Sequence, residues 1–171
     1  RGTNAGICLH EILEKFDFSL SAAEQAETVR ESLSRYGFEP RWQPAVHTML
    51  DRCRLAPLTA AYALADIPPQ NRLPEMGFTL YMEDFGLERL RAWFARPNSG
   101  LPPECAEAAR MLDFKDVQGF LSGFIDMVYQ DSDGLVCIID YKSNHLGNNA
   151  EAYTPQAMNE AMAHHHYYLQ A

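Results

Sequence analysis

The sequence predicts an α/β fold in which a small mixed β-sheet is flanked by helices. Two neighbouring apolar runs, rich in β-branched and aromatic residues, surround the polar stretch Asp131-Ser132-Asp133-Gly134. This pattern is typical of a β-hairpin. Segments with helical periodicity lie before and after it. With 171 residues, 47% of them apolar, the chain is long enough for one sizeable core and one domain.

The expected elements follow from capping residues and breakers. Thr3 or Asn4 is a plausible N-cap for the first helix, Gly37 stops the second, and Pro57 ends the third. Pro155 opens the last helix. In chain order we expect helices over residues 2–18, 21–37 and 44–58, a strand over 72–82, a helix over 83–96, a loop over 97–105, the hairpin over 123–144, a loop over 145–155 and a helix over 155–171.

The turn of the hairpin sets its register. If the loop consists of three residues ending in Gly134, with that glycine in the left-handed conformation, then Asp131 pairs with Leu135. Counting back from this pair places Asp126 directly across from Asp140, on one face of the ribbon. A register shifted by one residue would put the two aspartates on opposite faces.

Two facing carboxylates are unfavourable unless a cation lies between them. At a few ångströms, Asp126 and Asp140 would repel by roughly 1 to 4 kcal/mol. Mg²⁺ removes that repulsion and is typically held by one or two carboxylates. Lys142 shares the face of Asp140, where it would orient a water or neutralise charge on a phosphate. The alternative is an ordinary solvated strand end with an Asp-x-Lys pattern.

His10, near the middle of the first expected helix, is a further candidate ligand. An isolated helical histidine is more commonly a packed or surface residue, and sequence spacing does not bring it to the hairpin. If the helix packs near Asp126 and Asp140, an imidazole and two carboxylates would form a mixed nitrogen and oxygen site. Such a site is acceptable to Mg²⁺ and better suited to Mn²⁺.

Composition argues against several other classes of protein. The net charge of −9 does not favour a broad basic surface for nucleic acid, although a metal–carboxylate site is itself acidic. The chain contains no CxxC pair and no Walker-type phosphate loop, so we expect neither an iron–sulfur cluster nor a bound nucleotide. We also expect no signal peptide, no membrane span and a cytoplasmic location with reduced thiols. The four cysteines are Cys8, Cys53, Cys105 and Cys137.

Four segments together resemble one known family. In order, "GICLHEILE", "GFIDMVY", "IIDYKSNHLG" and "YTPQAMNEAMAHHHYYLQ" are similar to the C-terminal nuclease domain of RecB-type β subunits of bacterial exodeoxyribonuclease V (RecBCD). That domain is a restriction-endonuclease-like member of the PD-(D/E)XK nuclease superfamily. Ile125 replaces the proline of the superfamily signature, as in RecB-type proteins. The resemblance implies a core of this type with an N-terminal helical portion.

The resemblance also implies a domain organisation. We expect a single nuclease domain over residues 1–171, with residues 19–69 as a helical insertion that contributes little to the similarity. Because the chain starts with Arg1 and ends inside an expected helix, we interpret it as a C-terminally truncated fragment of a larger helicase–nuclease subunit. In that setting the function would be metal-dependent hydrolysis of DNA in double-strand break repair by homologous recombination.

The resemblance further implies roles for individual residues. Lys142 would be the catalytic lysine, acting with Asp126 and Asp140, and Lys142 and Gln170 would contact DNA. Glu75 would support the metal ligands without binding the ion itself. The alternative, which stays open, is that Glu75 is an ordinary exposed glutamate of a strand. The implied metal ligands are His10, Asp126, Asp140 and the backbone carbonyl of Tyr141.

Cofactor and partners follow from the same resemblance. They are Mg²⁺, with Mn²⁺ or Ca²⁺ as substitutes, together with DNA, the subunits RecC and RecD, and RecA as a further partner. The alternative is a non-cutting module that docks the recombinase or the partner subunits. A degenerate module would be expected to lack Asp126, Asp140 or Lys142, and all three are present. Three consecutive histidines, residues 164–166, point in different directions on a helix, so we interpret them as structural or close to DNA.

Overall fold

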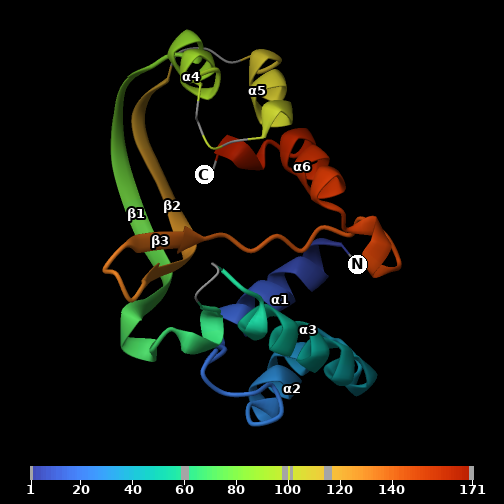
Figure 1. Ribbon diagram of the computed structural model, residues 1–171. Helices are drawn as coiled ribbons and strands as arrows, with labels where there is room; N and C mark the ends of the chain where they lie inside the picture. The colour runs from blue at the N-terminus through green and yellow to red at the C-terminus, as the bar shows by residue number, and fades with distance from the viewer. Residues whose placement is uncertain (1, 59–61, 98–99, 101, 114–116, 170–171) are drawn as a thin grey trace. The chain divides into compact units, whose positions relative to one another are not determined.

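The computed structural model describes residues 2–58, 62–97, 100, 102–113 and 117–169, and it has the predicted α/β composition. The chain divides into two compact units. The first unit comprises residues 1–78 and 123–143, and the second comprises residues 79–122 and 144–171. Strands β1 (Arg72–Phe85) and β2 (Val117–Gln130), drawn in Figure 1, each contain residues of both units. Within the described residues no helix is long and apolar enough to cross a membrane.

Helix α1 of the first unit spans Thr3–Lys15. Its N-cap is Gly2, with a φ of 92°, so the prediction that Thr3 or Asn4 caps this helix is wrong. Thr3 is the first helical residue, and the Asn4 amide donates a hydrogen bond to the carbonyl of Tyr36 at 3.1 Å. The polar side chain therefore links two helices instead of capping its own.

Helix α2 spans Ala26–Arg35 and begins later than its predicted start at Ser21. The Ser21 backbone N–H and hydroxyl donate to the carboxylate of Glu24 at 2.8 and 2.7 Å. This local turn competes with the helix, as serine and glutamate near a helix start commonly do. The predicted stop is confirmed, since Gly37 adopts a left-handed φ of 73°.

The core of the first unit lies between three helices and one face of the hairpin. Helix α3 spans Gln43–Leu55 and ends before Pro57, as predicted. Full burial of each aliphatic or aromatic side chain contributes about 1.5–3 kcal/mol. Because one face of the hairpin is buried in this core, the opposite face is more open to solvent and carries both polar and apolar residues. The core includes Cys8, Ile12, Leu13, Phe16, Phe18, Val29, Leu33, Val46, Leu50, Met127 and Tyr129.

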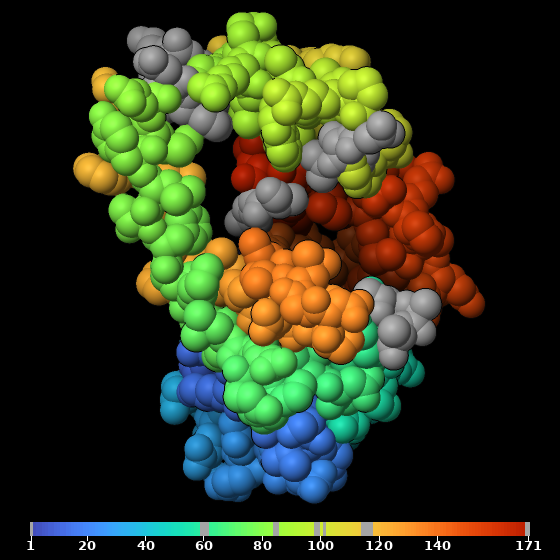
Figure 2. Space-filling view, turned by 60° about the vertical axis from the view of Figure 1, so that its left-hand side comes forward, coloured from blue at the N-terminus to red at the C-terminus, as the bar shows by residue number. Residues whose placement is uncertain are grey.

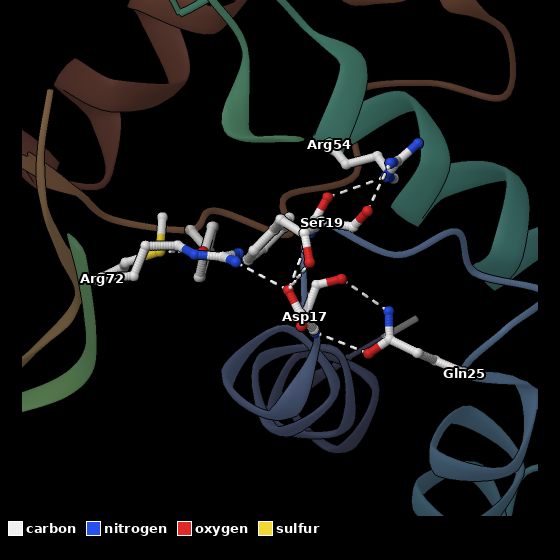
Figure 3. Close-up of polar contacts among 8 residues, drawn as sticks. Asp17, Ser19, Gln25, Arg54 and Arg72 are labelled. Carbon is white, nitrogen blue, oxygen red and sulfur yellow. Dashed lines mark hydrogen bonds and ion pairs between the residues drawn. The ribbon is translucent and has the colours of Figure 1, made fainter. Parts of the chain in front are cut away.

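A polar cluster joins the end of α1 to the start of strand β1 (Figure 3). The Arg72 guanidinium, whose side chain is only 6% exposed, donates to the Asp17 carboxylate at 2.8 Å and lies over the Phe18 ring. The Gln25 side chain donates to the Asp17 carbonyl and accepts from its N–H, both at 2.8 Å. Arg54 donates to the Phe18 carbonyl at 3.1 Å. These bonds fix where β1 begins.

The sheet has the strand order β1-β2-β3. The strands span Arg72–Phe85, Val117–Gln130 and Val136–Ile139, so β1 and β2 are longer than predicted. Figure 2 shows the hairpin (orange) against the green segment that leads into β1. The Tyr62 hydroxyl joins the two by donating to the Asp131 carboxylate at 3.1 Å.

The second unit contains helices α4 (Leu87–Phe94), α5 (Pro103–Arg110) and α6 (Pro155–His164). Helix α5 was not predicted, because its short sequence follows a loop rich in proline and glycine. The prediction that the last helix continues to the chain end is wrong, since His166 has a left-handed φ of 55°. A 3₁₀ turn follows α6. The buried core of this unit consists of Phe94, Cys105, Ala109 and Tyr168.

Candidate functional site

The register of the hairpin is the predicted one. Met127 pairs with Ile139, and continuing this antiparallel register by one residue places Asp126 opposite Asp140. At the turn, the Asp131 N–H donates to the Leu135 carbonyl at 3.0 Å. The loop ends at Gly134, whose φ of 83° is left-handed as expected. Continued in this way, the register would place both aspartates on the face of the hairpin opposite Met127 and Ile139.

Asp126 is held by groups from two elements. Its Oδ2 accepts a hydrogen bond from the backbone N–H of Tyr141 at 2.6 Å. The same oxygen lies 3.6 Å from Nδ1 of His10, on α1. The Asp126 side chain is 15% exposed and that of His10 is 33% exposed, so both can still be reached by a ligand. The helix thus brings His10 to the hairpin, a contact that sequence spacing did not establish.

Asp140 follows directly after strand β3 and forms an ion pair with Lys142. The pair is partly open to solvent, with side-chain exposures of 36% for Asp140 and 30% for Lys142. Strand β3 ends at Ile139, and the residues that follow it, 140–147, belong to no strand of the described sheet. Lysine and both carboxylates therefore lie around the end of one hairpin.

Glu75, on strand β1, lies close enough to Asp126 for their charges to interact. The Phe124 ring contacts Gly77, and the Phe78 ring contacts Gly123, so β1 and β2 pair in a register that leads Glu75 toward Asp126. Burial raises the pKa of Glu75, and the negative charges of Glu14 and Asp126 raise it further, while His10 opposes them. Glu75 also has a left-handed φ of 49°, which is costly for a residue with a side chain.

Sequence reasoning missed Glu14. Its carboxylate contributes to the raised pKa of Glu75, so it lies near the site. The signal was present in "HEILE", because residues four apart on a helix lie on the same side one turn along. Gly6, one turn before His10, is also close to this region, since a Cβ there would lie 3.1 Å from Oγ of Ser143. Helix α1 therefore passes close to the segment that carries Lys142.

The donor set suits a hard divalent cation, although no ready-made metal cluster is present among the described residues. In the ranges that the structure defines, no three His, Cys, Asp or Glu side chains come together as ligands. Asp126 is engaged by Tyr141 and His10, and Asp140 is engaged by Lys142. Carboxylate oxygens and one imidazole are nevertheless ligands that Mg²⁺ and Mn²⁺ accept.

Two further predicted features concern the end of the chain. Gln170 falls outside the residues that the structure describes. The histidines 164–166 belong to the second unit, where His165 stacks on Tyr167 with ring centroids 5.3 Å apart. His166 forms a hydrogen bond with the buried Tyr168 hydroxyl at 2.9 Å. The described histidines thus have packing roles at the end of α6.

Comparison with known proteins identifies the class. A family profile of the PD-(D/E)XK nuclease superfamily matches residues 2–170, and the chain belongs to this superfamily of nucleases. The restriction-endonuclease-like α/β fold is therefore confirmed. Nucleases of this superfamily use divalent metal ions, which fits the nitrogen and oxygen donors of the site.

The particular relatives are RecB proteins. The chain is 35% identical to the RecBCD enzyme subunit RecB of Escherichia coli (strain K12), over 99% of its own length and 14% of that protein. It is 30% identical to RecB of Haemophilus influenzae over 98% of the chain and 13% of the relative. It is 29% identical to RecB of Mycobacterium tuberculosis (strain CDC 1551) over 99% of the chain and 18% of the relative. The resemblance to RecB-type nuclease domains is confirmed, and the chain spans less than a fifth of each relative.

Proposed function

We propose that this chain hydrolyses phosphodiester bonds of DNA with Mg²⁺, as the nuclease domain of a RecB-like subunit of a helicase–nuclease that acts in recombinational repair. The observation that supports the proposal is the register of the hairpin, whose last pair, Met127 and Ile139, lies directly beside Asp126 and Asp140, together with the ion pair between Asp140 and Lys142. His10 approaches Asp126 from α1. The superfamily match supplies the reaction class.

The proposed ligands of the cation are His10, Asp126, Asp140 and the backbone carbonyl of Tyr141. When bound, a divalent cation polarises a phosphate and lowers the pKa of a water molecule. The cation also removes the repulsion between the two aspartates. Mn²⁺ or Ca²⁺ would occupy the same position, because oxygen and imidazole ligands do not strongly select Mg²⁺.

The chain's own residues position the substrate and the proton. The Lys142 ammonium, at the end of the hairpin, neutralises negative charge that develops on the phosphate and orients the attacking water. The Tyr141 N–H holds one oxygen of Asp126, so that carboxylate keeps its direction when DNA binds. Glu75, with its raised pKa, is the proposed supporting group beside Asp126. Gln170 is the proposed DNA contact from the end of the chain.

Domain organisation and partners belong to the same proposal. Residues 1–171 would act as one nuclease domain with residues 19–69 as its helical insertion, within a longer cytoplasmic subunit that assembles with RecC and RecD. The second candidate is a non-cutting module that docks RecA or partner subunits. The presence of Asp126, Asp140 and Lys142 disfavours it, because a docking surface has no need of facing carboxylates.

The test compares nicking of supercoiled plasmid by the wild type, Asp140→Ala and Asp133→Ala, with Mg²⁺ and after addition of EDTA. Asp133 is the matched control, because it is an exposed aspartate in the turn of the same hairpin. Asp140→Ala should lose at least about 100-fold in rate, Asp133→Ala should keep the wild-type rate, and EDTA should stop cleavage.

A second measurement addresses metal binding without cleavage. Titration with Mn²⁺, followed by calorimetry, should show one site in the wild type that is lost in Asp126→Ala. Equal nicking by the wild type and Asp140→Ala, after contaminating nucleases are excluded, would remove the proposed site. Absence of nicking in all proteins, with retained binding of partner subunits, would favour the docking module.

A further inference from the structure

Phe124 is an exposed aromatic residue on the face that carries Asp126. Its side chain is 72% exposed, and it precedes Asp126 by two residues in β2. Side chains two apart in a strand point to the same face, about 7 Å apart. The Phe124 ring lies against Gly77, where a Cβ would be 3.4 Å from Cε1 and 3.7 Å from Cδ1. One surface of the ring is therefore supported by backbone, and most of the ring is open to solvent.

An open phenyl ring beside a phosphodiester site has a recognisable chemical use. Aromatic side chains next to a path for the nucleic-acid backbone stack on bases, and they do so with every base because each has a π-face. On the other side of Asp126, the same face carries the aliphatic residues Val128 and Ile138, which offer no such surface. Among these described neighbours of Asp126, the aromatic surface is that of Phe124.

We propose that Phe124 stacks on the base of the nucleotide next to the bond that is cut, and so positions single-stranded DNA over Asp126. This inference rests on the proposed nuclease function and adds a residue that positions the substrate. In a duplex the same base is stacked and paired with its neighbours, and freeing it costs energy. Phe124 accordingly makes its contact where that base is unpaired.

A purely structural role would be cover for Gly77, since aromatic residues commonly shield a glycine across a strand pair. The two roles differ in what they respond to. A structural role affects folding and all substrates alike, whereas a stacking role depends on whether a base is present at one position of the DNA.

The experiment uses the protein at its natural full length, without ATP and with Mg²⁺, on a 5′-labelled thymidine oligonucleotide with a single abasic position. In the wild type, cleavage should fall about tenfold at the bond beside the abasic position, equivalent to about 1.4 kcal/mol. On the intact oligonucleotide, Phe124→Leu should raise KM about tenfold and leave kcat little changed. On the abasic oligonucleotide, this variant should cut the bond beside the abasic position as readily as the other bonds.

Two variants keep the test independent of folding. Phe124→Trp should restore the wild-type KM and the reduced cleavage beside the abasic position, because indole also stacks. Leu55→Ala, at an exposed leucine of α3, should behave as the wild type. Photo-cross-linking with a single 5-iodouracil, in EDTA, should join the base to Phe124 without cleavage. The inference is overturned if cleavage beside the abasic position is still reduced in Phe124→Leu, or if the base cross-links to another residue. A wild type that does not cut, but cross-links at Phe124, contradicts the nuclease proposal and leaves the base contact standing.

Discussion

Gly6 shows how one missing side chain can set the geometry of the site. It lies one turn before His10 on α1, and a Cβ at this position would lie 3.1 Å from Oγ of Ser143. That distance is shorter than an ordinary contact, so Ser143 would have to move. Ser143 directly follows Lys142, so we expect its displacement to shift Lys142, which forms the ion pair with Asp140.

The variant Gly6→Ala should therefore separate stability from activity. Alanine is a better helix former than glycine by about 1 kcal/mol, so the free energy of unfolding should stay equal or rise. The rate of DNA cleavage should fall about tenfold, because small misplacements of catalytic groups are costly. Urea unfolding and plasmid nicking measure the two quantities.

Removing the opposing atom provides the control for this variant. The double variant Gly6→Ala/Ser143→Ala should recover the wild-type rate, since the serine oxygen is the atom that the new Cβ meets. A double variant as slow as Gly6→Ala would show that the close approach is unimportant.

Glu11 is a second residue whose environment makes a measurable prediction. Its carboxylate accepts hydrogen bonds from Lys15, from the Tyr36 hydroxyl at 2.7 Å and from Arg35 on the neighbouring helix. The bond from Lys15, then that from Tyr36, lowers the pKa of Glu11 below its ordinary value of 4.5. A lowered pKa in the folded state means that the contribution to stability is complete above pH 4.5 and is lost as the pH falls through the folded-state pKa.

Glu11→Gln should reduce the free energy of unfolding by about 1–3 kcal/mol at pH 7. The difference from the wild type should shrink below pH 4.5, where the wild-type carboxylate becomes protonated. Urea unfolding at a series of pH values between 7 and 3 measures it. A difference that stays constant over this range would contradict the assignment of the stabilisation to the charge of Glu11.

At the scale of elements, the start of β1 is anchored to the end of α1. Arg72 is buried and is paired with Asp17, which also exchanges two hydrogen bonds with Gln25 before α2 (Figure 3). A buried charge without its partner costs more than an apolar replacement of the charged residue. The anchor thus joins two helices to the strand that carries Glu75.

Two substitutions at this anchor should differ in a diagnostic way. Asp17→Asn leaves the Arg72 guanidinium buried without a carboxylate and should cost about 2–4 kcal/mol. Arg72→Met fills much of the same space without a charge and should cost less. Thermal unfolding of both variants measures the order, and a greater loss for Arg72→Met would mean that packing on Phe18, rather than the ion pair, stabilises the anchor.

At the scale of the whole molecule, the two units have separate cores. The second unit is built around Tyr168, 1% exposed, whose ring meets that of Phe94 edge to face at 5.0 Å. The candidate site residues that the structure describes all belong to the first unit. Loss of one core should therefore affect the two units unequally.

Tyr168→Ala should destabilise the second unit by about 3–5 kcal/mol, through the lost apolar contacts and the cavity. Hydrogen exchange should accelerate first at the amides of α4, α5 and α6, with smaller changes in α1 and α3. Tyr168→Phe is the control and should lose only the hydrogen bond with His166. Equal acceleration in both units would show that they unfold as one.

The amino-acid sequence alone determined the features that depend on neighbours along the chain. The hairpin register follows from a left-handed glycine at position 134 and from alternation, and the stops of α2 and α3 follow from Gly37 and Pro57. Caps and short helices were predicted less well, because Asn4 and Ser21 found other partners and α5 has only 8 residues. Local conformational preferences are weak when a tertiary contact competes with them.

Only the tertiary structure decided which distant groups meet at the hairpin. His10 reaches Asp126 because α1 shares a core with the hairpin, in which Cys8 and Ile12 are buried together with Met127. The approach of Glu75 depends on the pairing of β1 with β2 and on an unusual φ that no pattern in the sequence signals. Periodicity states which face a side chain occupies on its own element. The distance between side chains on different elements is set by how the cores pack, which involves residues from the whole first unit.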